Sequence, residues 1–195
     1  MATLTGSDIL AKSLVTQGMD TLFYIMGGPM IETEAAIIKL GARAIDTRHE
    51  QAASLMAHAY SRITRKPGVC MGASGPGATN LVTPIADAYM DSVPIVAITG
   101  QVASAAIGTD AFQEADIRGI TMPITKHNFL VTDPAEIPRT VAEAFYLASH
   151  AYAPEQERGI RWNDPRFDIE WPIEPTVISD KDRSYRDFDP AWHLA

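Results

Sequence analysis

The uncharged run Ile95-Val96-Ala97-Ile98 has β-branched side chains at three of its four positions. Such a run is typical of a strand that is covered on both faces, and strands of this kind build parallel sheets. Shorter apolar runs at 22–26, 42–45 and 69–71 alternate with segments of helical periodicity. This alternation predicts an α/β fold, with an open, mostly parallel sheet, helices on both faces and right-handed crossovers.

Helical segments are expected between these runs. Thr5 and Asp8 fit a capping box, and the helix that they begin should end at Gly18. Further helices are expected up to about residue 40, around 53–60, from about 78 to 90, and over 137–148. Phe129-Leu130-Val131 is a candidate for one more strand, after an irregular stretch at about 108–121.

The composition changes near residue 150. All three tryptophans, five of the 13 prolines and 16 of the 40 charged side chains lie in the last 45 residues. Prolines at this density exclude a regular helix across the segment, and the strand–helix alternation does not continue. We therefore predict a domain over 1–149 and an irregular C-terminal tail over 150–195.

Charge and composition exclude several classes of protein. The net charge of −8 argues against nucleic-acid partners and anionic membrane surfaces, and the 46% hydrophobic content is that of a globular chain. No apolar stretch reaches the roughly 18 residues of a membrane helix, and no basic leader precedes an apolar segment, so a soluble, cytoplasmic protein is expected. Cys70 is expected to be a buried small hydrophobe.

Glu50 is the first candidate for chemistry, because it follows the second expected strand and begins a helix of mostly small and apolar residues. Open α/β sheets bind ligands at the carboxyl ends of their strands, and a carboxyl group there can serve as a proton carrier. The alternative is an ordinary acidic residue that the helix macrodipole favours.

The glycine-rich turn at 74–80 is the second candidate, since it lets backbone N–H groups approach a ligand at a helix start. The spacing of Gly72, Gly75 and Gly77 fits neither the dinucleotide fingerprint nor a P-loop. A tight turn that permits close packing of helix on sheet explains the same glycines.

Six blocks in this chain resemble, in order and spacing, the aminopyrimidine-binding (PYR) domain of thiamine diphosphate enzymes of the acetohydroxyacid (acetolactate) synthase family. They are Met26-Gly27-Gly28, Arg48-His49-Glu50-Gln51-Ala52, Ser74-Gly75-Pro76-Gly77-Ala78-Thr79-Asn80, Ala88-Tyr89-Met90-Asp91-Ser92-Val93-Pro94, Ile98-Thr99-Gly100-Gln101-Val102 and Gly108-Thr109-Asp110-Ala111-Phe112-Gln113-Glu114. The resemblance extends from residue 5 to about Ala148.

The resemblance implies that Glu50 hydrogen-bonds N1′ of the cofactor's aminopyrimidine and exchanges a proton there, so that the cofactor can attack a 2-keto acid. It also implies an acetolactate synthase-like decarboxylation and carboligation, and a homo-oligomer. By motif position, the residues that would line the cofactor pocket or its substrate side are Gly27, Gly28, Pro76, Asn80, Gln113 and Phe112. Turn geometry, a helix-stabilising amide and plain core packing are the alternative explanations of these positions.

The chain departs from the family in two ways that matter for function. After Ser149 the family's last strand is missing, and Ile25-Met26 replaces the aromatic-proline pair common before the two glycines. The family binds the diphosphate and Mg²⁺ in a different domain with a Gly-Asp-Gly motif, which this chain lacks. We therefore expect no metal ligand here, and we expect Mg²⁺ from another domain or chain; the family also admits FAD.

The tail has a resemblance of its own, to the C-terminal end of dTDP-4-dehydrorhamnose 3,5-epimerase. It is carried by residues 152–165, 169–172 and 178–183. In that family the histidine base and most of the barrel precede this part, so the tail alone should have no epimerase activity. The alternatives to a half-site of a thiamine diphosphate enzyme are therefore an epimerase fragment fused to a foreign domain and a catalytically inert fusion product.

Overall fold

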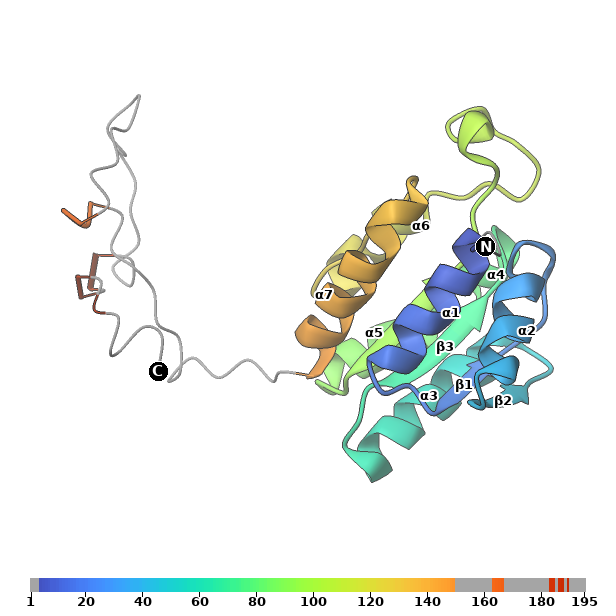
Figure 1. Cartoon of the computed structure of the whole chain (residues 1–195), viewed down its shortest axis with the longest axis horizontal. Helices are drawn as coiled ribbons and strands as arrows, with labels where there is room; N and C mark the ends of the chain where they lie inside the picture. Colours follow the sequence, from blue (N-terminus) through green and yellow to red (C-terminus); the bar gives the residue numbers. More distant parts are fainter. Residues whose placement is uncertain (1–3, 150–162, 167–182, 185, 188, 190–195) are drawn as a thin grey trace. The chain divides into compact units, whose positions relative to one another are not determined.

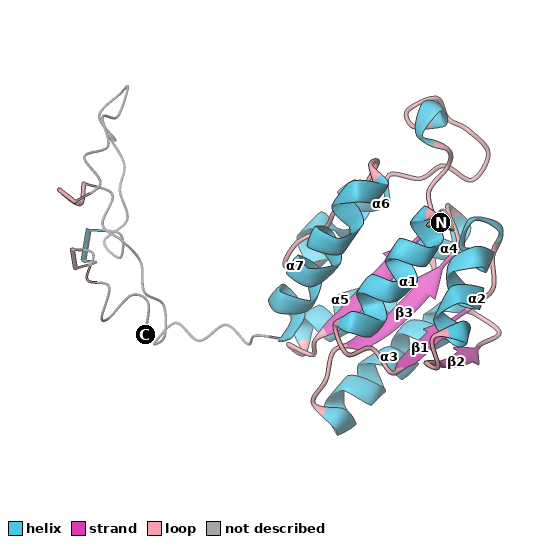
Figure 2. Ribbon diagram, in the orientation of Figure 1, coloured by secondary structure: helices cyan, strands magenta, loops and turns pink. Residues whose placement is uncertain are grey.

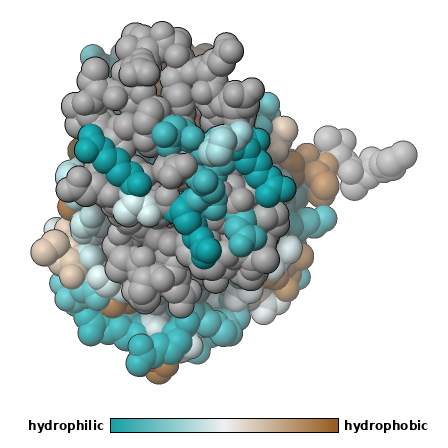
Figure 3. Space-filling model, turned by 90° about the vertical axis from the view of Figure 1, so that its left-hand side faces the viewer, coloured by the Kyte–Doolittle hydropathy of each residue, from teal (hydrophilic) through white to brown (hydrophobic). Residues whose placement is uncertain are grey.

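The computed structural model describes residues 4–149, 163–166, 183–184, 186–187 and 189. The chain divides into two units, Met1–Ala151 and Tyr152–Ala195 (Figure 1). In the described part of the second unit, Asp164 is buried and its Oδ1 accepts from the Arg166 backbone N–H at 2.8 Å, which closes a short turn. The described residues among 183–189 are exposed. Figure 3 shows hydrophilic residues on the face of the molecule that is turned to the viewer.

The first unit is built on a four-stranded sheet in which all pairs are parallel. Its strands are β1 (Thr21–Tyr24), β2 (Arg43–Asp46), β3 (Gly68–Gly72) and β4 (Ile95–Thr99), in the order β2-β1-β3-β4. The predicted open, parallel α/β sheet is thereby confirmed. Because the strands are parallel, all four carboxyl ends lie at one edge of the sheet.

Helices cover the two faces of this sheet (Figure 2). They are α1 (Gly6–Thr16), α2 (Ile31–Lys39), α3 (Glu50–Thr64), α4 (Pro76–Thr79), α5 (Val82–Met90), α6 (Ile117–Thr121) and α7 (Ile137–Ser149), with 3₁₀ turns η1 (Gly28–Met30), η2 (Ser104–Ala106), η3 (Met122–Ile124) and η4 (Pro134–Glu136). Thr5 caps α1 and forms the expected capping box with Asp8.

The protein has one core cluster on each face of the sheet, because successive side chains of a strand point to opposite faces. Leu22 of β1 and Met71 of β3 belong to a core cluster with residues of α1, α2 and α7. Phe23 and Cys70, the next residues along the pleat, belong to a second cluster with residues of α3 and α5. Cys70 is fully buried, as expected, and burial raises the pKa of its thiol to about 12.

Three expectations about secondary structure are wrong. The helix expected over about 78–90 is two helices, because Pro84 has no N–H to donate to the Asn80 carbonyl. Phe129–Val131 forms no strand, because no neighbouring strand offers these residues a backbone ladder within the described part of the chain. β4 is one of the two edge strands and only partly buried, rather than covered on both faces.

None of the helices in the described segments has an apolar stretch long enough to cross a lipid bilayer.

Candidate functional site

The turns that follow the four strands converge at the carboxyl edge of the sheet. Residues 25–27 follow β1, 47–49 follow β2, 73–75 follow β3, and Gly100 follows β4. A Cβ added to Gly100 would lie 2.8 Å from Pro29 Cγ and 3.0 Å from the Ser74 nitrogen, so the turns after β1, β3 and β4 touch. Ligands of open α/β sheets bind at such an edge.

Glu50 is the first residue of α3 and lies at this edge. His49 caps the helix through Nδ1, which accepts from the Gln51 backbone N–H at 3.1 Å. Thr47 ties the preceding turn to β1, because its hydroxyl donates to the Tyr24 carbonyl at 3.1 Å. The Glu50 backbone is therefore held by contacts on both sides of it, at the start of α3.

The Glu50 carboxylate has a defined partner from another part of the chain. Asn80 Nδ2, at the end of α4, donates to Glu50 Oε2 at 2.9 Å. Both residues are half-buried, so the pair is accessible from the edge of the sheet. The structure thus brings together two of the residues that the sequence predicted for one site, 30 positions apart.

Close backbone approach explains the glycines around this pair. A Cβ on Gly77 would lie 3.2 Å from Glu50 Oε1 and 3.1 Å from Ala73 Cβ. A Cβ on Gly27 would lie 2.5 Å from the same Ala73 atom, which is closer than real contacts allow. Gly27 and Gly77 therefore pack closely on Ala73, beside the Glu50 carboxylate, at positions where a larger side chain would not fit.

The other residues predicted for the site differ in their exposure and in their contacts. Pro76 begins α4 and is exposed, and Gly28 is exposed with no atom within 4 Å of an added Cβ. The backbone carbonyl of Gln113 lies over Gly75, which has a φ of 56° and would bring an added Cβ to 2.5 Å from that oxygen. Phe112 is 89% exposed and does not wall a cavity within the described chain.

Sequence reasoning missed Glu34, which is buried in the first turn of α2 with 2% of its surface exposed. Neither carboxyl oxygen has a hydrogen-bond partner of good geometry among the described residues. Burial raises the pKa of Glu34 to about 7, the nearby Gly27 backbone N–H lowers it, and Asp46 raises it. A signal was present, since Glu34 shares the buried helix face with Met30 and Ile37.

This raised pKa makes stability depend on pH. The folded protein keeps the Glu34 proton up to about pH 7, whereas the ordinary pKa is 4.5, so the folded state binds more protons between these values. The free energy of unfolding should fall by on the order of 2 kcal/mol from pH 4.5 to 7. Urea denaturation of Glu34→Gln should show a flatter profile than wild type; an unchanged profile would contradict this, and Glu32→Gln, an exposed neighbour, is the control.

A second group of polar side chains joins α3 to α5. His58 Nδ1 lies 3.1 Å from Asp87 Oδ2, and His58, Asp87 and Asp91 are close enough to share a metal ion. However, Arg62 Nε donates to His58 Nε2 at 2.9 Å and its Nη2 donates to Asp91. A guanidinium in this position already supplies the positive charge, so we interpret the group as an ion-pair network.

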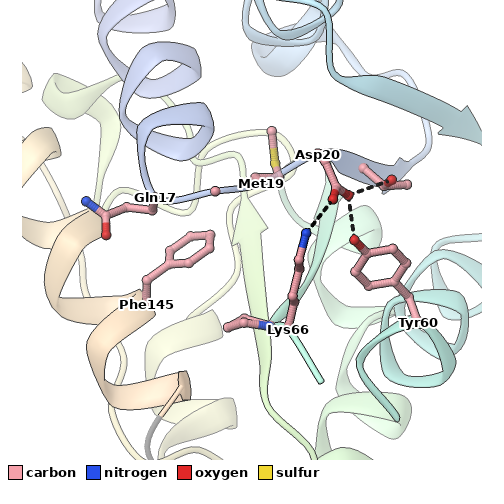
Figure 4. Close-up of a pocket in the computed structure, with 9 residues that line it drawn as sticks. Gln17, Met19, Asp20, Tyr60, Lys66 and Phe145 are labelled. Atoms are coloured by element: carbon pink, nitrogen blue, oxygen red, sulfur yellow. Dashed lines mark hydrogen bonds and ion pairs between the residues drawn. The ribbon is translucent and has the colours of Figure 1, made fainter. Parts of the chain in front are cut away.

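A pocket of about 240 Å³ lies at the opposite edge of the sheet, at the amino ends of β1 and β3 (Figure 4). Asp20 accepts from Tyr60 at 2.5 Å and from Lys66 at 2.9 Å beside it. The Tyr60 hydrogen bond, followed by that of Lys66, lowers the pKa of Asp20. These partners satisfy one another, so the network stabilises the strand starts and is separate from the Glu50 site.

Comparison with known proteins gives two family matches. Residues 4–120 match the thiamine pyrophosphate enzyme, N-terminal TPP binding domain. Residues 124–189 match dTDP-4-dehydrorhamnose 3,5-epimerase. Each match agrees with one of the two resemblances seen in the sequence, although the second begins upstream of residue 150.

The chain also has close relatives among known proteins. It is 55% identical over 146 residues to the acetolactate synthase large subunit of Corynebacterium glutamicum, a stretch that covers 74% of this chain and 23% of that protein. It is 55% identical over 147 residues to an acetolactate synthase of Mycobacterium bovis (75% and 24%) and 51% identical over 145 residues to the chloroplastic acetolactate synthase of Arabidopsis thaliana (74% and 22%). This chain therefore spans about a quarter of the length of these relatives.

Proposed function

Because the chain belongs to the thiamine pyrophosphate enzymes, whose N-terminal TPP binding domain it carries, we propose that its first unit is the aminopyrimidine-binding half of an acetolactate synthase-like active site. Its reaction would be decarboxylation of a 2-keto acid followed by carboligation. The chain would act together with a diphosphate-binding domain or chain, in a homo-oligomer.

The observation that carries this proposal is the Glu50–Asn80 pair beside Gly77. A carboxylate can accept a hydrogen bond from a protonated ring nitrogen, and Asn80 fixes the carboxylate by donating to its other oxygen. Gly27 and Gly77 let the backbone pack closely on Ala73 and on the Glu50 carboxylate, so a flat ring would reach the half-buried Glu50–Asn80 pair from the sheet edge without meeting a side chain at these two positions. The donor set and the cradle thus fit an aminopyrimidine.

Thiamine diphosphate, when bound, supplies the nucleophilic carbon and the electron sink for the chemistry of a 2-keto acid. In our proposal Glu50 holds a proton at N1′ of the ring and exchanges it, while Asn80 keeps the carboxylate oriented. Gly27, Gly28 and Pro76 would line the ring, and Gln113 would lie towards the substrate. Mg²⁺, the diphosphate contacts and any FAD would belong to the partner domain.

The epimerase match over residues 124–189 supports a second candidate, a fragment of a dTDP-sugar enzyme joined to this domain. Of the tail part of this match, the structure describes residues 163–166 and a few positions beyond 182. The two candidates differ in ligand, which allows one titration to compare them.

We expect the isolated chain to bind thiamine diphosphate with Mg²⁺ more weakly than about 1 μM and not to turn over pyruvate, because the aminopyrimidine contacts alone must offset the entropy of association. Isothermal calorimetry of the full chain is the measurement. Gly77→Val should abolish the binding, because its side chain would press on the Glu50 carboxylate, whereas Ala59→Val on the exposed face of α3 should preserve it.

Two results of this titration would count against the proposal. Binding of dTDP in place of thiamine diphosphate would favour the epimerase candidate. Equal binding of thiamine diphosphate by Gly77→Val and Ala59→Val would place the cofactor away from Glu50.

A further inference from the structure

Glu34 is an acid that the proposed mechanism does not use. It lies on the buried face of α2, both of its carboxyl oxygens are buried without a partner of good geometry in the described chain, and 2% of the residue is exposed. A buried carboxyl group without hydrogen bonds costs stability, so a group retained in this state calls for an explanation.

Glu34 lies one helix turn beyond Met30 on the same buried face, and the Met30 N–H donates to the Gly27 carbonyl at 2.8 Å, so the carboxyl group lies on the side of α2 that adjoins the Gly27–Gly28 turn. The Gly27 backbone N–H also lowers the pKa of Glu34. Gly27 packs closely on Ala73, and Ala73 in turn packs on Gly77, beside Glu50 Oε1. Tight contacts therefore run from the turn after β1 to the Glu50 carboxylate. A small shift of Gly27 would be transmitted, because packed interiors have little free space to absorb it.

We propose that Glu34 is a positioning residue, whose buried carboxyl group holds the Gly27–Gly28 turn and with it one wall of the aminopyrimidine pocket. The inference rests on the proposed function of that pocket. When Glu34 ionises, we expect its carboxylate to attract the Gly27 N–H more strongly than the protonated carboxyl group does, because charge-assisted hydrogen bonds are the stronger ones. The turn is then held most firmly when Glu34 carries its charge.

Other titratable groups lie near the Gly27–Gly28 turn, and their titration must be distinguished from that of Glu34. Tyr24 from β1 and Asp46 from β2 both interact with it, and Arg48 pairs with Asp46 at 2.8 Å. Burial, followed by Glu34 and Asp46, raises the pKa of Tyr24, so this phenol keeps its proton in the neutral range. Burial raises the pKa of Glu34 to about 7, so its carboxyl group titrates in the neutral range at this turn.

The Gly27 amide reports on Glu34 without any cofactor. In the full chain we expect the ¹H shift of the Gly27 amide to titrate between pH 5.5 and 8.5 with a midpoint near 7, and to be flat in Glu34→Gln. Glu32→Gln removes the same charge from an exposed position of the same helix turn and should leave the titration intact. A flat Gly27 shift in wild type, or the same titration in Glu34→Gln, would overturn the proposal.

Cofactor binding gives the second readout. At pH 8 we expect Glu34→Gln to bind thiamine diphosphate with Mg²⁺ about tenfold more weakly than wild type, and at pH 6, where wild type is protonated, the two should be equal. A merely structural role would weaken binding equally at both pH values, and that result would reject positioning by the charge. If Glu34→Gln does not fold, Glu34→Met replaces it. The titration of the Gly27 amide in the wild-type chain then still tests the proposal.

The two proposals can fail separately. A wild-type chain that binds no thiamine diphosphate while its Gly27 amide titrates as expected would refute the function but keep the role of Glu34 in holding the turn. Binding to wild type with no titration at Gly27 would refute the role of Glu34 alone.

Discussion

Replacing Glu50 by glutamine should lower turnover by about 10² to 10⁴ once a chain that carries the diphosphate-binding domain of an acetolactate synthase is supplied. Glutamine can still accept the hydrogen bond from Asn80 Nδ2, which now measures 2.9 Å, but it cannot exchange a proton. Folding stability should therefore change much less than rate. The measurement is kcat with pyruvate for the complemented protein, beside urea denaturation of each variant.

Glu143→Gln is a matched control for this experiment, because it removes one carboxylate from an exposed surface of α7, away from the sheet edge. It should keep the parental rate. A Glu50→Gln protein that keeps half of that rate would show that another group carries the proton, and it would defeat our assignment of Glu50.

Gly68→Ala should cost at least about 3 kcal/mol of stability, above the usual range for overpacking. A Cβ at Gly68 would lie 2.0 Å from the Ala57 carbonyl oxygen and 2.6 Å from its carbon, and both atoms belong to the backbone of α3. A side chain could rotate away, but a helix backbone cannot, so α3 must move off β3. The loss of unfolding free energy is measured by chemical denaturation, from the shift of the midpoint between wild type and variant when both have the same m-value.

Gly6→Ala makes the same chemical change where space is available, since an added Cβ there would meet Pro134 at 3.8 Å. At the first position of α1, alanine should be neutral or stabilise by up to about 1 kcal/mol. If both variants lost the same free energy, the close packing of β3 on α3 would not explain Gly68.

Local patterns were sufficient to predict the strands, most helices and the place of Glu50. Alternation of apolar runs with helical periodicity identifies parallel strands, and their carboxyl ends then meet by topology. Asn80, 30 positions from Glu50, was assigned to the same site only through the family resemblance of the 74–80 block, and the structure joins the two side chains by a hydrogen bond.

The expectations that proved wrong depend on contacts between distant parts of the chain, which no local sequence pattern encodes. Whether a β-branched run such as β4 lies at the centre or at the edge of a sheet depends on which other strands exist. Phe129–Val131 could form a strand only beside a neighbouring strand with which to pair. The exposure of Phe112 likewise depends on what lies beyond its own loop. Glu34 was missed because an acidic residue in a first helix turn is ordinarily explained by the macrodipole.

The edge position of β4 has a consequence for the behaviour of this protein at high concentration. Its five residues carry no charge and no proline, Ala97 at its centre is exposed, and in the described chain no strand pairs with its outer side. Natural sheets protect such edges with lysine, proline or a bulge, because unpaired N–H and C=O groups recruit strands from other molecules. Where nothing covers β4, intermolecular β-pairing competes with the native fold, and a short uncharged strand of this kind can seed aggregation.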